Sequence, residues 1–103
     1  MRWYHYLALF FAGAFLANAV PHFVQGISGH SFPTPFATPP GQGESPPLIN
    51  VLWASFNLIV GYVLGRVGGL SIRRTRDAVI VGAGVILTAV MLANAFGPLY
   101  AGR

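Results

Sequence analysis

Five polar side chains interrupt or border the apolar stretches of this sequence, and their chemistry most needs an explanation. They are four amides and one imidazole: Asn18, His22, Asn50, Asn57 and Asn94. An amide offers both hydrogen-bond donors and an acceptor, and an imidazole can also bind a metal or transfer a proton. Each group is costly in an apolar environment unless it is paired, so these side chains are expected to face protein or trapped water.

Metal binding and catalysis are poorly supported by the rest of the sequence. A metal site could be sought at His22 and His30, but the chain has no cysteine and the nearest carboxylate is Glu44. A closed structural zinc site needs about four ligands. The other carboxylate, Asp77, lies far along the chain, and no acid–base pair or nucleophile motif is present. We expect no catalytic residue, no metal, no cofactor and no enzyme activity.

The composition indicates an integral membrane protein. The chain has 103 residues, enough for a single domain spanning residues 1–103. Hydrophobic residues make up 54% of it and charged residues only 8%, whereas a soluble domain has roughly 25% charged residues. The net charge of +4 comes from arginines beside apolar stretches, and membrane topology explains these better than nucleic acid does.

Three apolar stretches are each long enough to cross a bilayer as a helix. Their expected bounds are about 4–20, 48–65 and 78–96, and Pro21 and Gly97-Pro98 are expected to end the first and third. A competing interpretation treats the first stretch as a signal peptide cleaved after Ala17-Asn18-Ala19. Two further stretches and the recurrence of Leu-Ala-Asn-Ala at residues 92–95 favour a retained helix. The sequence therefore predicts an all-α membrane protein with three transmembrane helices.

The segment between the first two stretches, residues 21–47, has an unusual composition. It contains seven prolines, four glycines and no lysine or arginine, which excludes a regular helix or strand throughout. It also carries apolar side chains, among them Phe23, Ile27, Phe32 and Phe36. We expect a long Pro/Gly-rich loop that folds over the outer ends of the helices. The alternative is a disordered loop.

Small and amide residues follow one face of the second stretch. Their spacing of four, three, four and four residues is helical, and they are Asn50, Ala54, Asn57, Gly61 and Gly65. The two glycines form a GxxxG motif, which is typical of closely packed membrane helices. Gly13 and Ala17 have the same spacing in the first stretch. This pattern predicts that the second helix packs closely against another helix.

The arginines predict the orientation in the membrane. The short loop at residues 66–77 contains Arg66, Arg73, Arg74 and Arg76, and Arg2 falls on the same side if the chain crosses three times. Short arginine-rich loops stay in the cytoplasm, so the amino terminus is expected inside and the carboxyl terminus outside. These arginines could also attract anionic lipid headgroups.

This topology brings the ends of three stretches near the outer leaflet, where Asn18, Asn50 and Asn94 lie. Three interpretations of the amides and His22 stay open. They could form hydrogen bonds between helices, form a polar site for an ion, small solute or lipid headgroup, or simply be exposed at the membrane interface.

Several short motifs occur together between residues 12 and 64. They are Asn18-x-x-Pro21-His22-Phe23, Gly26-x-x-Gly29, Phe32-Pro33-x-Pro35-Phe36 and Asn50-Val51-Leu52-Trp53. In this combination the chain resembles a family of small bacterial membrane proteins of unassigned function. The resemblance implies a bacterial inner-membrane location and an ordered loop, and it carries no catalytic or binding role.

Two functions are consistent with these patterns. Three short helices enclose little volume, and small-residue seams suggest further helices, so an oligomeric interaction or assembly subunit is expected, as a homo-oligomer or within a larger membrane complex. The alternative is a small oligomeric channel or transporter. Its outer vestibule would be lined by four amides, Asn18, Asn50, Asn57 and Asn94.

Overall fold

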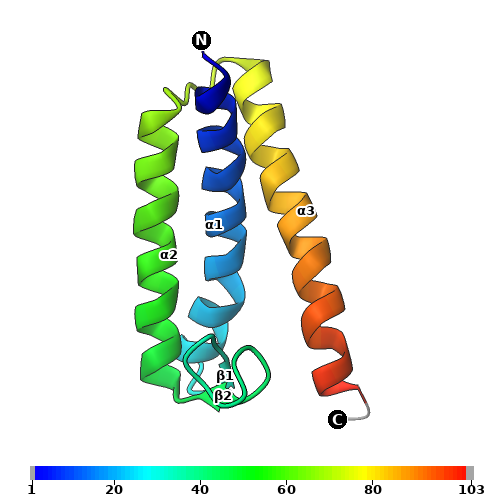
Figure 1. Ribbon diagram of the computed structural model, residues 1–103. Coiled ribbons are helices and arrows are strands. Elements are labelled where there is room, and N and C mark those ends of the chain that lie inside the picture. Colours follow the sequence, from blue (N-terminus) through cyan, green and yellow to red (C-terminus); the bar gives the residue numbers. More distant parts are fainter. Residues whose placement is uncertain (1, 102–103) are drawn as a thin grey trace.

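The computed structural model describes residues 2–101 and contains, within them, three long helices and a two-stranded hairpin (Figure 1). The helices are α1 (Trp3–Ile27), α2 (Pro47–Val67) and α3 (Thr75–Tyr100), and the strands are β1 (Phe32–Pro33) and β2 (Glu44–Ser45). Each helix is long and apolar enough to cross a membrane. Residues 1, 102 and 103, which the expected single domain includes, lie outside the described residues.

The central element is α1, with α2 and α3 packed along it (Figure 1). The loop and hairpin between α1 and α2 lie at one end, and the short connection from α2 to α3 lies at the other. In Figure 1, α3 lies beside α1 near the amino-terminal end of both helices and diverges from it toward the carboxyl terminus. The bundle is therefore tighter at one end of α3 than at the other.

The closest contact between α1 and α3 is made by two glycines, each of which faces the backbone of the other helix. A Cβ atom at Gly13 would collide with the Val81 carbonyl, and one at Gly84 would collide with the Phe10 carbonyl. Only residues without a Cβ let two helix backbones approach so closely. This contact depends on the shape of the two helices.

The GxxxG pair of α2 is divided between two environments. A Cβ atom at Gly61 would lie 2.9 Å from the Leu16 side chain, which is a tight contact between α2 and α1. At Gly65 the nearest atom belongs to Leu70, at 3.7 Å. Of the two glycines, Gly61 therefore lies at a close approach between helices, whereas Gly65 meets only the segment that follows α2.

Two helices extend past the prolines that were expected to end them, so these two expectations were wrong. The first helix continues through Pro21 to Ile27, and the third continues through Pro98 to Tyr100. A proline removes a single helical hydrogen bond, and contacts beyond it can hold the next turn in place. In α1 such a contact is made by Gly26, where an added Cβ would lie 2.8 Å from the Pro47 carbonyl oxygen.

The longer α1 changes the segment that joins it to α2. The loop begins at Ser28, and β1 pairs antiparallel with β2 through Phe32 opposite Ser45. The Thr34 and Ser45 hydroxyls are hydrogen-bonded at 2.6 Å, and both residues are buried. The hairpin is therefore held together by backbone pairing and by a buried hydrogen bond between side chains. The other connection, from α2 to α3, is also shorter than expected, since it runs from residue 68 to residue 74.

Candidate functional site

The extension of α1 places an imidazole opposite an amide of α2. His22 Nδ1 lies 2.8 Å from Asn50 Oδ1, and the two residues are 2% and 0% exposed. The Asn50 amide nitrogen donates to the carbonyls of Phe32, Ser45 and Pro46 at 3.1, 3.0 and 3.3 Å. These three acceptors fix the orientation of the amide, so its oxygen faces the ring and His22 Nδ1 is the donor.

The Asn50 amide therefore connects four segments that are separate in the sequence. It joins α2 to α1 through His22 and to both strands of the hairpin through their backbone carbonyls. Aromatic rings surround the imidazole, with centroid distances of 5.4 Å to Phe32 and 6.4 Å to both Trp53 and Phe96. A buried polar pair of this kind holds the loop and the helices in one arrangement.

A second amide pair lies deeper in the bundle. Asn18 Nδ2 donates to Asn57 Oδ1 at 3.0 Å, and Asn57 Nδ2 donates to the Trp53 carbonyl at 2.8 Å. Asn57 is fully buried, and Asn18 is half-buried. Asn18 and Asn57 line a groove of about 470 Å³, whose other lining residues are Phe10, Phe11, Ala14, Phe15, Leu87, Thr88 and Met91. The pair is thus a hydrogen bond between α1 and α2 beside an apolar groove.

The fourth amide is not part of this arrangement. Asn94 is exposed on α3, and no hydrogen bond connects its side chain to the other amides within the described chain. Sequence reasoning grouped it with them because it ends an apolar stretch at the same depth. Depth along a helix does not determine which face a side chain occupies, and α3 directs Asn94 away from α1.

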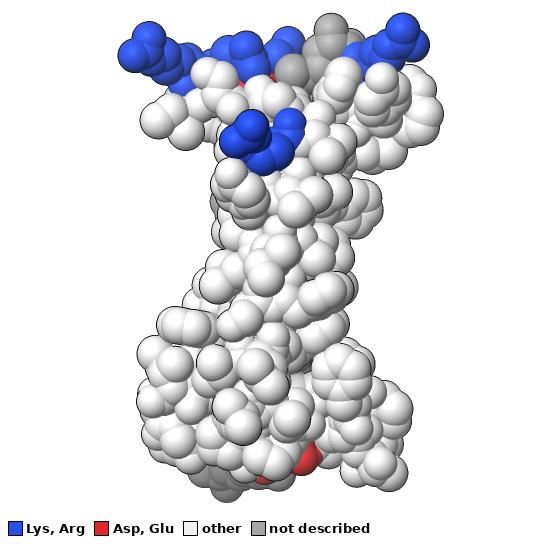
Figure 2. Space-filling model, turned by 90° about the vertical axis from the view of Figure 1, so that its left-hand side faces the viewer, with Lys and Arg blue, Asp and Glu red and all other residues white. Residues whose placement is uncertain are grey.

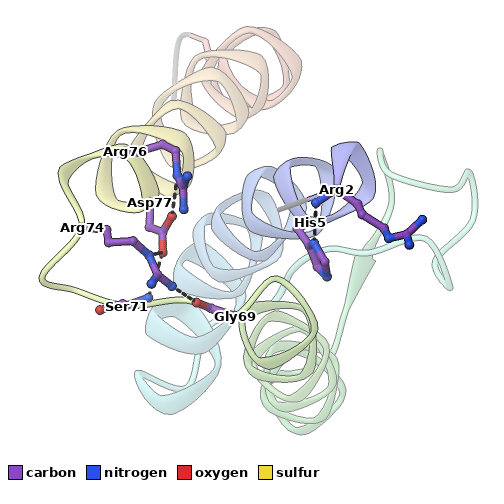
Figure 3. A network of polar contacts seen from close by, with 7 residues as sticks. All are labelled: Arg2, His5, Gly69, Ser71, Arg74, Arg76 and Asp77. Carbon is purple, nitrogen blue, oxygen red and sulfur yellow. Dashed lines mark hydrogen bonds and ion pairs between the residues drawn. The ribbon is translucent and has the colours of Figure 1, made fainter.

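At the opposite end of the bundle, a buried carboxylate organises the arginine-rich connection (Figure 3). Asp77 is 0% exposed, and it accepts hydrogen bonds from the Ser71 backbone N–H at 3.0 Å and from Arg74 Nε at 2.9 Å. Arg76 Nε lies 3.3 Å from the other carboxylate oxygen, and its guanidinium stands over the Tyr6 ring. Asp77 lies in the first turn of α3, where a negative charge is favourable.

Three further arginines of the described chain lie exposed at this end. Arg66 donates to its helical neighbour Tyr62 at 3.3 Å, and Arg2 and Arg73 are exposed. Figure 2 shows basic side chains gathered at this end and a long uncharged middle. Sequence reasoning listed the arginines but missed the part of Asp77, although an acidic residue following Arg74-Thr75-Arg76 was a usable signal.

The described residues provide hydrogen bonding without a metal centre. Among them, no group of three or more His, Cys, Asp or Glu side chains is close enough to hold a metal ion. His30 is paired locally with Gln25 at 2.9 Å. Sequence reasoning missed the contact at the far end of α3, where the Tyr100 hydroxyl donates to Glu44 at 2.7 Å. That contact links the carboxyl end of α3 to the hairpin.

Comparisons with known proteins assign no family to this chain. No family model, curated protein or solved structure matches it. Its function must therefore be inferred from its own contacts.

Proposed function

We propose that this chain is an integral membrane subunit that acts by associating with other protein helices in the bilayer. The observation that carries the proposal is the unequal burial of the helices. In the apolar parts of α1 and α3, 39% and 6% of the residues are buried. Among the described residues of α3, only Asp77 and Gly84 are buried. A helix that uses so little of its surface within the chain leaves most of it for partners or lipid.

The state of the amides supports packing over transport. In a vestibule, the amides would have unpaired groups directed at water or solute. Asn50 and Asn57 are instead 0% exposed, and their amide groups bond to His22, Asn18 and backbone carbonyls. Because Asn94 lies apart from the other three amides, it cannot line a vestibule together with them within one chain. The amides are better explained as structural bonds between helices.

The expected orientation is part of the proposal. The arginine-rich end, with Arg66, Arg73, Arg74 and Arg76, would face the cytoplasm and its anionic lipid headgroups. The hairpin, with Glu44, would face outward. The family resemblance supports placing the chain in a bacterial inner membrane.

Site-directed labelling checks this orientation. Gln42 and Ile72 are both exposed, lie at opposite ends and belong to a chain without cysteine. In intact cells, a membrane-impermeant maleimide is expected to label Gln42→Cys, and Ile72→Cys is expected to react only after permeabilisation. Equal labelling of both variants in intact cells would contradict three crossings with this orientation.

The association itself is tested by native mass spectrometry after mild extraction from the membrane of origin. We expect species whose mass exceeds that of one 11.0 kDa chain together with its bound lipid. A chain that is released only as a monomer, across detergents that preserve its helical structure, would overturn the proposal.

A further inference from the structure

One amide in this chain lacks the partner that its surroundings require. Asn94 is exposed on α3, and its side chain has no hydrogen-bond partner among the described residues. The backbone carbonyl of Asn94 also lacks its helical hydrogen bond, because the donor would be residue 98, and Pro98 has no N–H. Hydrogen-bond donors and acceptors of Asn94 are therefore available on a stretch of α3 whose other exposed side chains are apolar.

The position of Asn94 along the helix makes water an unsuitable partner. At about 1.5 Å per residue, Asn94 lies roughly 24 Å along the helix from Ala78. It also lies about 9 Å inside Tyr100, which bonds to Glu44 at the hairpin end. The hydrocarbon of a bilayer is about 30 Å thick, so Asn94 falls within it when Asp77 and Glu44 mark the two surfaces. Lipid tails offer an amide no hydrogen bond.

Asn94 lies in the middle of a regular seam on α3. The seam is spaced by four, three, four and three residues, and it consists of Ala83, Leu87, Val90, Asn94 and Gly97. Leu87 and Val90 are 59% and 54% exposed, and a Cβ atom at Gly97 would meet nothing within 4 Å. This 3.5-residue repeat is the pattern with which two helices pack side by side. Most of the seam faces away from α1, since Gly84, Thr88 and Leu92 occupy the packed side, and only Leu87 at its edge also lines the groove beside Asn18.

We propose that this seam is the docking surface for a second copy of the chain, with the two Asn94 amides paired across a twofold axis along the membrane normal. This inference rests on the proposed function and names its partner. Copies inserted with the same topology are parallel, so an asparagine in the seam meets its own equivalent. An amide is complementary to itself, because its N–H donates to the oxygen of the other.

The charges at the arginine-rich end are compatible with this pairing. Arg76 lies on the same face of α3 as the seam, but its guanidinium is engaged by Asp77 and stands 5.6 Å from the Tyr6 ring centroid of its own chain. Asp77 is buried beneath it and partly balances its charge. The two copies therefore meet along the apolar part of α3.

Association in vesicles tests the role of Asn94. The chain, labelled at Ile72→Cys with donor or acceptor dyes, is diluted in vesicles of phosphatidylethanolamine and phosphatidylglycerol, and energy transfer is followed against protein density. Asn94→Leu is expected to raise the density needed for half-association about threefold to tenfold. Asn94→Gln, which keeps the amide, is expected to stay within about twofold of the parent chain.

Disulfide formation between copies tests the seam independently of Asn94. On mild oxidation, Val90→Cys is expected to form a covalent dimer. Ala89→Cys is the matched control, because it is exposed at the same depth but lies outside the seam. Equal cross-linking of the two variants, or unchanged association of a folded Asn94→Leu variant, would overturn the proposal that this seam is the docking surface. If the chain still associates in those cases, the proposed function stands. A chain that stays monomeric in vesicles and in native mass spectrometry would overturn both.

Discussion

Between α1 and α2 the polar side chains lie inside the contact, whereas between α1 and α3 the closest approach is made by backbone atoms. Asn50 and Asn57 are buried against His22 and Asn18. On the other side, Gly13 and Gly84 bring two backbones together. Directional hydrogen bonds specify one register, and close packing specifies one shape. One small chain thus uses two different means to position two helices against the same central helix.

The shape-based contact is expected to be the easier one to break. Gly84→Leu places a side chain where even a Cβ collides with the Phe10 carbonyl, so α3 must move away from α1. We expect the free energy of unfolding to fall by about 3 kcal/mol, which is near the upper end of the range that is usual for overpacking substitutions. Thermal unfolding in one detergent measures it.

The control for this variant lies on the same helix. A Cβ atom at Gly82 meets nothing within 4 Å, so Gly82→Leu adds the same bulk to open space. Its melting temperature is expected to stay close to that of the parent chain. Similar losses in both variants would show that leucine harms α3 itself, and the proposed backbone contact would not explain the result.

The hydrogen-bonded contact is expected to depend on Asn50. Replacement by leucine leaves the His22 N–H and the Ser45 carbonyl without their partner in a buried place. The expected loss is about 2 kcal/mol. The matched control is Asn94→Leu, which removes an amide that has no partner within the described chain and should leave the unfolding of a monomer unchanged. Equal losses of stability in Asn50→Leu and Asn94→Leu would show that the hydrogen bonds of Asn50 do not stabilise the contact between α1 and α2.

The smallest expected effect concerns the deeper amide pair. Asn57→Leu should cost about 1 kcal/mol, because amides of an unfolded chain in the membrane also find partners. The double variant with Asn18→Leu should cost less than the sum of the single variants, since no amide is then left alone. Melting temperatures of the three variants measure this coupling. Additive losses would show that the Asn18–Asn57 bond at 3.0 Å contributes little to the contact.

The sequence was informative where local properties decide the structure. Three long apolar stretches predict three membrane-crossing helices, because hydropathy and length act within each segment. The face of α2 that carries Asn50, Ala54, Asn57, Gly61 and Gly65 follows from helical spacing, and all five residues are buried.

The sequence was misleading where contacts between distant segments decide. Pro21 predicts a helix end, but the turn beyond it is held by Gly26 against α2, and only this turn brings His22 to Asn50. Asn94 repeats the local motif of Asn18 on a helix that faces elsewhere. Local similarity of two motifs says nothing about their partners, which depend on how each helix packs.

The pairing of α1 with α2 also has a consequence for insertion during synthesis. An α2 that entered the bilayer alone would carry the Asn50 and Asn57 amides into lipid unpaired. By then α1 has already been made and offers His22 and Asn18 as partners, so these two helices are expected to enter as a pair. The more apolar α3 carries one amide in this region, Asn94, and the described parts of α1 and α2 offer it no hydrogen bond. Since α3 is also made last, it enters the membrane with most of its surface still uncovered.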